Sequence, residues 1–204
     1  MKIVLASSNE HKVKEINAIV STFPLIREMA EEGTTTNKLE FILPPSDFDP
    51  IEDGQTFEEN SLIKAKAAWE LSKTWTLADD SGLCIDALKG APGIHSARYA
   101  ETPQARINRV LKEMKGIKNR TARFKCCMTL INPQGEIAFS YTGICEGSII
   151  EGQRGVNGFG YDPIFLLENS NKTMAELSEE EKNRVSHRGK ALNAILEYIK
   201  KIPA

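Results

Sequence analysis

The chain opens with a short apolar run that is followed by helical periodicity. Residues 2–6 are almost continuously apolar and end in polar, loop-forming residues, which is typical of a short buried strand. Beyond Lys12, apolar residues recur at the spacing of one helical face, namely Val13, Ile16, Ile19 and Val20. The pattern predicts a strand, a polar turn and a helix as the first unit.

A loop and a second helix are predicted next. The irregular segment 31–50 predicts a loop with one short strand around residues 41–43. Thr56, followed three residues later by Glu59, is a capping-box pattern that predicts a helix over residues 57–72.

The remaining pattern mixes strands and helices. The expected elements are a strand over residues 75–78 leading into an acidic turn at Asp79-Asp80-Ser81-Gly82, a helix from Thr102-Pro103 to Gly116, a hairpin of residues 123–131 and 137–141, a strand near residues 144–150, and helices after Ser178 and Ser186. This mixture predicts the α/β class with a mixed sheet. The length of 204 residues favours a single domain.

The composition restricts the class of protein. The 26 lysines and arginines nearly balance 28 aspartates and glutamates, which argues against a duplex nucleic-acid binder but leaves room for a small anionic ligand. The first apolar run is too short for a signal peptide, and no stretch approaches the roughly 20 apolar residues of a membrane helix. The cysteines form no Cys-x-x-Cys pair. A cytoplasmic protein with free thiols is expected.

The first candidate for chemistry is the segment Ser7-Ser8-Asn9-Glu10-His11-Lys12, between the predicted strand and helix. A helix N-terminus presents unpaired N–H groups and a positive dipole end, which suit phosphate, and Lys12 adds a charge. The same residues also suit simple N-capping by Ser8 or Asn9. Because no Walker pattern is present, spacing alone leaves both interpretations open.

The second candidate is the predicted turn Asp79-Asp80-Ser81-Gly82. Two carboxylates at the carboxyl end of a strand are well placed for Mg²⁺, which prefers oxygen ligands. Ligands of α/β sheets also gather at that edge. Since Asp, Ser and Gly are common turn residues, a solvated acidic turn is the alternative.

Two further candidates lie in the last third of the chain. A glycine-rich segment ends in Phe159-Gly160-Tyr161-Asp162, where glycine lets the backbone approach a flat ligand and Phe159 could stack on a base. Lys182 and the segment Ser186-His187-Arg188-Gly189 supply donors for a purine edge or a phosphate. The alternatives are a loop anchored by its aromatic residues and a solvated helix junction.

Taken together, these segments resemble one family, the inosine triphosphate pyrophosphatases, also called Ham1-like proteins. The matching blocks follow the family's order and span nearly the whole chain: Ala6-Ser7-Ser8-Asn9-Glu10-His11-Lys12, Phe57-Glu58-Glu59-Asn60 with Lys64-Ala65, Ala78-Asp79-Asp80-Ser81-Gly82-Leu83, Gly90-Ala91-Pro92-Gly93-Ile94-His95-Ser96-Ala97-Arg98-Tyr99, Gly158-Phe159-Gly160-Tyr161-Asp162-Pro163-Ile164-Phe165 and Ser186-His187-Arg188-Gly189-Lys190-Ala191.

The resemblance implies a fold and an activity. The fold would be an elongated mixed sheet with two α/β lobes around a central nucleotide cleft, within a single domain over residues 1–204. The activity would be Mg²⁺-dependent hydrolysis of ITP, dITP and XTP to the monophosphate and pyrophosphate, by a homodimer.

The resemblance also implies roles for individual residues. The triphosphate would be contacted by Ser7, Ser8, Asn9, Glu10, His11 and Lys12, with support from Lys64. Asp80 would be the proton acceptor and a Mg²⁺ ligand, and Ser81 would contact substrate. The base would be held by Phe159, Gly160, Tyr161 and Asp162, and its 6-oxo edge would be read by Lys182, His187 and Arg188. Glu52 resembles the second metal carboxylate, although a small shift of the alignment would select Asp53 or Glu58 instead.

Three questions stay open at this point. A carboxylate that ligates Mg²⁺ is a poorer base, so one of Asp79 and Asp80 could hold metal while the other accepts the proton. A donor aimed at a 6-oxo group rejects adenine, but no residue is identified that rejects guanine. The alternative functions are a Maf-type pyrophosphatase of other modified nucleotides and a nucleotide-binding regulator without catalysis.

Overall fold

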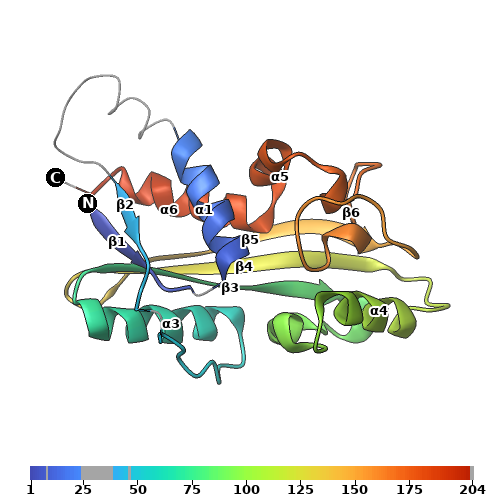
Figure 1. Cartoon of the computed structure of the whole chain (residues 1–204), viewed down its shortest axis with the longest axis horizontal. Helices are drawn as coiled ribbons and strands as arrows, with labels where there is room; N and C mark the ends of the chain where they lie inside the picture. Colours follow the sequence, from blue (N-terminus) through green and yellow to red (C-terminus); the bar gives the residue numbers. More distant parts are fainter. Residues whose placement is uncertain (8, 24–38, 46, 203–204) are drawn as a thin grey trace. The chain divides into compact units, whose positions relative to one another are not determined.

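The computed structural model of the chain describes residues 1–7, 9–23, 39–45 and 47–202. Its strands form a mixed sheet in the order β2-β1-β3-β4-β5-β6 (Figure 1), with β1 parallel to both β2 and β3 and with β5 antiparallel to β6. The strands are β1 Lys2–Leu5, β2 Glu40–Ile42, β3 Trp75–Ile85, β4 Thr121–Ile131, β5 Ile137–Ile149 and β6 Phe165–Leu167. The helices are α1 Glu10–Thr22, α3 Phe57–Ser72, α4 Pro103–Glu113, α5 Glu179–Val185 and α6 His187–Ile199. The predicted α/β class with a mixed sheet is confirmed.

The chain divides into two compact units. Unit 1 comprises Met1–Asp80, Cys127–Thr142 and Gly189–Ala204, and unit 2 comprises Ser81–Cys126 and Gly143–Arg188. The prediction of one domain with two lobes stays a prediction.

Unit 1 is built by helices on both faces of its strands. In Figure 1, α1 lies on one side of β1 and β3 and α3 lies on the other. Thr56 caps α3 through its hydroxyl, which accepts a hydrogen bond from the Glu59 N–H at 3.1 Å. The buried alanines Ala65 and Ala68 let α3 pack closely on the strands, in one cluster with Val4, Ala6, Phe48, Ala78 and Ile131. The predicted bounds of this helix, 57–72, are those of the structure.

Unit 2 has its own apolar core. Thr102 caps α4, Pro103 occupies its first turn, and Ile107 and Val110 form its buried stripe. The stripe belongs to a cluster that includes Phe124 and Phe165, whose ring centroids lie 4.5 Å apart. No helix among the described residues is long and apolar enough to cross a membrane.

Two sequence predictions are wrong. Residues 79–82 are not a turn but the middle of β3, which continues to Ile85. Both aspartates are buried and paired with lysines. These tertiary contacts outweigh the local turn propensity and determine the backbone conformation. Likewise, the two strands predicted near residues 137–141 and 144–150 are one continuous strand, β5. The irregular segment 31–50 lies partly outside the described residues.

Candidate active site

The two adjacent aspartates of β3 have different partners. Successive side chains of a strand point to opposite faces. Asp79, only 1% exposed, pairs with Lys12 of α1 at 2.9 Å between Nζ and Oδ2. Asp80, 6% exposed, meets α3 instead, where its Oδ1 lies 3.5 Å from the Lys64 ammonium. The structure therefore gives different partners to two carboxylates whose division of metal and base roles the sequence left open.

Asp80 shares its lysine with a second carboxylate. Lys64 Nζ also contacts Glu52 Oε2 at 3.1 Å, so Glu52 and Asp80 both approach one cation. The other carboxylate oxygen of Asp80, Oδ2, accepts a hydrogen bond from the Asn60 side-chain amide at 3.2 Å. Glu52, which resembles the family's second metal carboxylate, therefore shares Lys64 with Asp80, and its role as a metal ligand stays a prediction.

Burial and charge act in opposite directions on these groups. Burial raises the pKa of the Asp80 carboxyl above its usual value, and the opposing pull of Lys64 and Lys12 does not offset it. For Lys64, burial alone would lower the pKa, but Asp79, Asp80 and Glu52 together raise it above the usual value. Both pKa values can be raised at once. The Lys64 ammonium is surrounded by several carboxylates, whereas Asp80 has the like charges of Glu52 and Asp79 nearby. Lys64 therefore stays charged at neutral pH.

The start of α1 is capped by the chain itself. Asn9 Oδ1 accepts hydrogen bonds from the N–H groups of His11 and Lys12 at 3.1 and 3.2 Å. The Ser7 hydroxyl accepts a further bond from the Asn9 N–H at 3.3 Å. The capping interpretation is confirmed for Asn9, so a phosphate at this helix end would share donors with its cap. Ser8 lies outside the described residues.

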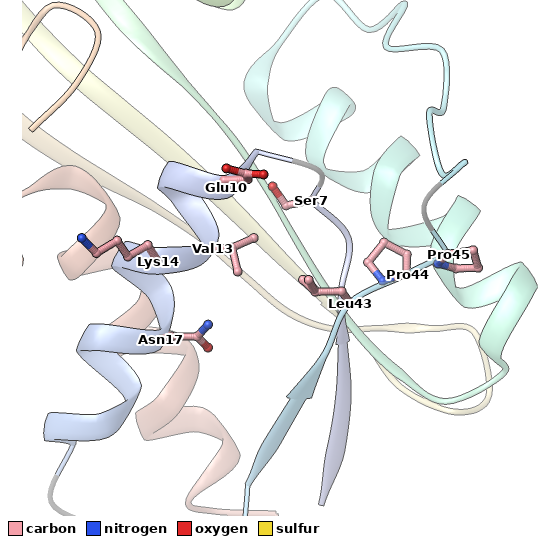
Figure 2. Close-up of a pocket in the computed structure, with 8 residues that line it drawn as sticks. All are labelled: Ser7, Glu10, Val13, Lys14, Asn17, Leu43, Pro44 and Pro45. Atoms are coloured by element: carbon pink, nitrogen blue, oxygen red, sulfur yellow. The ribbon is translucent and has the colours of Figure 1, made fainter.

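A pocket of about 550 Å³ opens on a face of α1 other than the one that carries Lys12 (Figure 2). Its walls are the helix residues Glu10, Val13, Lys14 and Asn17, Ser7 just before the helix, and, across from them in Figure 2, Leu43, Pro44 and Pro45. The helix residues follow the i, i+3, i+4, i+7 spacing of one face. Lys12 is on a different face, toward Asp79, and His11 is exposed. The residues of segment 7–12 therefore face different surroundings. Ser7 and Glu10 line the pocket, whereas Lys12 pairs with the Asp79 carboxylate.

Unit 2 holds a second cluster around Asp162. The Asp162 carboxylate accepts hydrogen bonds from Lys182 Nζ at 2.6 Å and from the Phe159 N–H at 2.8 Å. Asp162 and Lys182 are 3% and 5% exposed, so this pair is almost fully buried. The lysine ammonium also lies 4.7 Å from the centroid of the Phe159 ring. Gly158 has φ +72°, and a Cβ there would lie 2.1 Å from Asp162 Oδ2, so glycine is required for this close approach.

Arg188, His187 and Tyr161 are placed by separate contacts in unit 2. Arg188 Nη2 donates to the Ser81 hydroxyl at 3.0 Å, and its guanidinium lies 5.7 Å from the Phe159 ring. His187 stacks on Phe124 with ring centroids 4.8 Å apart. Tyr161 is buried, and its hydroxyl donates to the Ser96 carbonyl at 2.9 Å, while burial raises the pKa of its hydroxyl. For Tyr161, these contacts favour the anchoring interpretation over direct contact with a base.

Asn60 lies beside Asp80 in unit 1, and no role for it was predicted from the sequence. It is fully buried and contacts Asp80 directly. One signal was available, because Asn60 and Lys64 are spaced i, i+4 on the same helical face. A polar residue one turn before a buried lysine on that face indicates a shared partner.

The carboxylates of unit 1 fit a hard cation. Among the residues that the structure describes, no group of three or more His, Cys, Asp or Glu side chains is arranged to hold a metal ion. Mg²⁺, however, is commonly bound by one or two carboxylates together with waters and substrate phosphates. Glu52 and Asp80 already share one positive neighbour, so their oxygens suit that kind of site.

Comparisons with known proteins identify relatives of the chain over nearly its whole length. A model of the Ham1 family matches residues 3–198. A dITP/XTP pyrophosphatase of Treponema denticola is 46% identical over 206 residues, covering 98% of this chain and 99% of the relative. A dITP/XTP pyrophosphatase of Bacillus anthracis is 41% identical over 204 residues, covering 97% and 96%.

Solved structures show the same fold. A HAM1 protein from Coxiella burnetii superposes with a TM-score of 0.85 at 37% identity, covering 99% of this chain and 100% of that one. The Ham1 protein of Staphylococcus aureus gives a TM-score of 0.82 at 37% identity, covering 98% of both chains. Sequence and structure thus lead to the same conclusion: the chain belongs to the Ham1 family.

Proposed function

We propose that the protein is a pyrophosphohydrolase of deaminated purine nucleoside triphosphates, converting dITP, ITP and XTP to the monophosphate and pyrophosphate. Family membership and relatives named dITP/XTP pyrophosphatase support this substrate class. The observation that carries the proposal is the buried Asp80, which shares Lys64 with Glu52. A buried carboxylate beside a second carboxylate and a lysine is suited to metal-assisted phosphate chemistry.

Unit 1 would bind the triphosphate. Lys12 and Lys64 supply positive charge for the phosphates and for the pyrophosphate leaving group. Glu52 and Asp80 would hold Mg²⁺, which supplies charge neutralisation and acidifies bound water. Ser7, Ser8, Asn9, Glu10 and His11 complete the proposed phosphate segment.

Asp80 would orient the attacking water and accept its proton. The water oxygen forms a bond to the α-phosphorus, the bond from that phosphorus to the bridging oxygen breaks, and pyrophosphate leaves. Asp79 is less suited to this role, because its ion pair with Lys12 is shorter, 2.9 Å against 3.5 Å for Asp80 with Lys64, and because it is less exposed, 1% against 6%. The partners of the two aspartates thus support Asp80 as the catalytic residue.

Unit 2 would bind the base. Phe159 is the aromatic side chain of the cluster around Asp162, so we expect a purine to stack on its ring. Lys182, His187 and Arg188 supply donors for the 6-oxo group, with Gly160, Tyr161 and Asp162 shaping the loop and Ser81 adding a hydroxyl. An adenine amino group would leave such a donor unpaired, at a cost of about 1–3 kcal/mol.

The test is a substrate panel assayed for pyrophosphate. The protein is incubated with Mg²⁺ and, separately, ITP, dITP, XTP, GTP, ATP and dTTP. We expect fast release of pyrophosphate from the first three. Release of orthophosphate alone would overturn the bond assignment, and faster turnover of dTTP than of ITP would favour a Maf-type enzyme. Binding of ITP without any turnover would favour a regulator.

We also propose where the protein works and how it assembles. A nucleotide-cleansing enzyme works where nucleotides are used, so we propose a cytoplasmic protein, and a homodimer as its assembly. Cell fractionation and light scattering on the purified protein test these two points.

A further inference from the structure

We propose that Asn60 is a positioning residue that ties the loop carrying Glu52 to Asp80, so that the two carboxylates are held for one cation. This inference rests on the proposed function for its catalytic consequence. The contacts that carry it all lie within unit 1 and involve one side chain of α3, the loop before that helix and β3.

The Asn60 carboxamide connects two segments of the chain. Its Nδ2 donates to Asp80 Oδ2 at 3.2 Å, and its Oδ1 accepts from the Gly54 N–H at 2.9 Å. The side chain is fully buried, so both groups exchange water for protein partners, and each would be costly to leave unpaired. Gly54 is two residues beyond Glu52, so the same amide fixes both the loop and the aspartate.

The two contacts also fix the orientation of the amide. If its oxygen and nitrogen were exchanged, the oxygen would face the Asp80 carboxylate and the nitrogen would face the Gly54 N–H. Both contacts would then be repulsive, acceptor against acceptor and donor against donor. Asn60 therefore has one favourable orientation, and in it Asp80 is held through Oδ2 while Oδ1 faces Lys64.

The loop approaches the helix as closely as its backbone allows. A Cβ at Gly54 would lie 2.7 Å from Asn60 Oδ1 and 2.8 Å from Glu59 Cβ, closer than any side chain tolerates. The next N–H group, of Gln55, donates to Glu59 Oε2 at 2.6 Å. Two successive backbone donors thus attach the loop to the first turn of α3, and Glu52 is carried by that attachment.

Asn60 acts on the carboxylates without contacting the cation. Groups that hydrogen-bond to metal ligands orient them, and their loss typically costs 10–100-fold in metal affinity. We therefore expect an Asn60 variant to bind a divalent cation about 10–100-fold more weakly.

The experiment measures Mn²⁺ binding to the nucleotide-free protein by electron paramagnetic resonance, together with Tm. Asn60→Ala is compared with Ser61→Ala, its matched control. Ser61 is the next residue of α3, equally buried, with a hydroxyl 2.6 Å from that of Thr129. We expect both variants to lower Tm, but only Asn60→Ala to raise the Kd for Mn²⁺ by 10–100-fold. A Kd within about twofold of wild type in Asn60→Ala, an equal loss in Ser61→Ala, or no saturable binding by wild type would overturn the proposal.

A second variant keeps the proposal testable if Asn60→Ala does not fold. Gly54→Ala pushes the loop away from Asn60 without touching Asp80, so it should weaken Mn²⁺ binding similarly. The two changes should not add in the double variant, because both break one connection. Additive losses would contradict the proposed mechanism. Since Mn²⁺ binding needs no substrate, a wild type that releases no pyrophosphate would overturn the proposed function while leaving this test intact.

Discussion

The two clusters of charged side chains, one around Asp80 in unit 1 and one around Asp162 in unit 2, differ in net charge. In unit 1, the carboxylates of Glu52, Asp79 and Asp80 face the ammonium groups of Lys12 and Lys64, which leaves one negative charge in excess. In unit 2, Asp162 faces Lys182 with Arg188 nearby, which leaves one positive charge in excess. A cluster with excess negative charge is suited to a polyphosphate only if a cation joins it, whereas one with excess donors is suited to an oxygen-bearing base.

The largest effect is expected from Asp80→Asn. If Asp80 accepts the proton of the attacking water, kcat for ITP should fall about 10²–10⁴-fold, the usual contribution of a general base. Steady-state assays of pyrophosphate release measure it. Near-normal turnover would refute the assignment and leave the carboxylate cluster of unit 1 without its proposed role.

Removal of divalent cations should affect the function of the unit 1 cluster but not that of the unit 2 cluster. With excess EDTA, turnover of ITP should be lost and should return on addition of Mg²⁺, because the negative cluster then lacks its cation. Binding of inosine, which carries no phosphate, should be unchanged when followed by ligand-detected NMR. If EDTA also abolished inosine binding, the proposed separation of phosphate and base between the clusters would be wrong.

Asp79→Asn should mainly affect stability. Asp79 forms a buried pair with Lys12, and removal of one partner of a buried pair typically costs about 3–5 kcal/mol. Urea denaturation of the metal-free protein should show this loss of unfolding free energy. A stability close to that of wild type would mean that the pair contributes little to the fold of unit 1.

Arg188→Lys should change selectivity. The variant keeps the charge but loses the planar fork that reaches the Ser81 hydroxyl. Loss of one donor to the 6-oxo group is worth about 1–3 kcal/mol, so the ratio of kcat/KM for ITP to that for ATP should fall roughly 5- to 150-fold. An unchanged ratio would place the discrimination elsewhere.

The smallest effect is a pH dependence of stability. Burial raises the pKa of Asp80 in the folded state, so its contribution to stability is present below its unfolded pKa and is lost as pH rises through the folded pKa. In the metal-free protein, Asp80→Asn should therefore gain unfolding free energy relative to wild type as the pH rises above about 4, the usual pKa of an unfolded aspartate. Denaturation curves at several pH values test this, and a difference that shrinks toward pH 7 would contradict the raised pKa.

The parts of the fold that sequence predicted well depend on local chemistry. The cap at Thr56 defines the start of α3, and the apolar spacing after it extends the helix to Ser72. The course of β3 through Asp79 and Asp80 was not predictable in this way, because it depends on lysines contributed by α1 and α3. Local propensity describes a residue with its neighbours in sequence, and these partners are distant in sequence.

The candidate site likewise combines features that the sequence predicted with one that depends on a contact it does not reveal. The resemblance assigned Glu52 and Asp80 to the metal and Lys64 to the triphosphate, and the structure brings these three side chains together, while their roles stay predictions. Asn60 lies within a matching block and on the helical face of Lys64, but its proposed role also needs a backbone N–H of the preceding loop, which a side-chain pattern does not reveal.

The continuity of β3 has a consequence for how the protein can change over evolution. Asp80 is the last residue of one unit and Ser81 the first of the other, and both lie within an unbroken strand. A turn would tolerate an inserted or deleted residue, but in a strand one added residue reverses the facing of every side chain beyond it. The segment around Asp80 should therefore accept substitutions of size or polarity at some positions, while its length stays invariant among functional descendants.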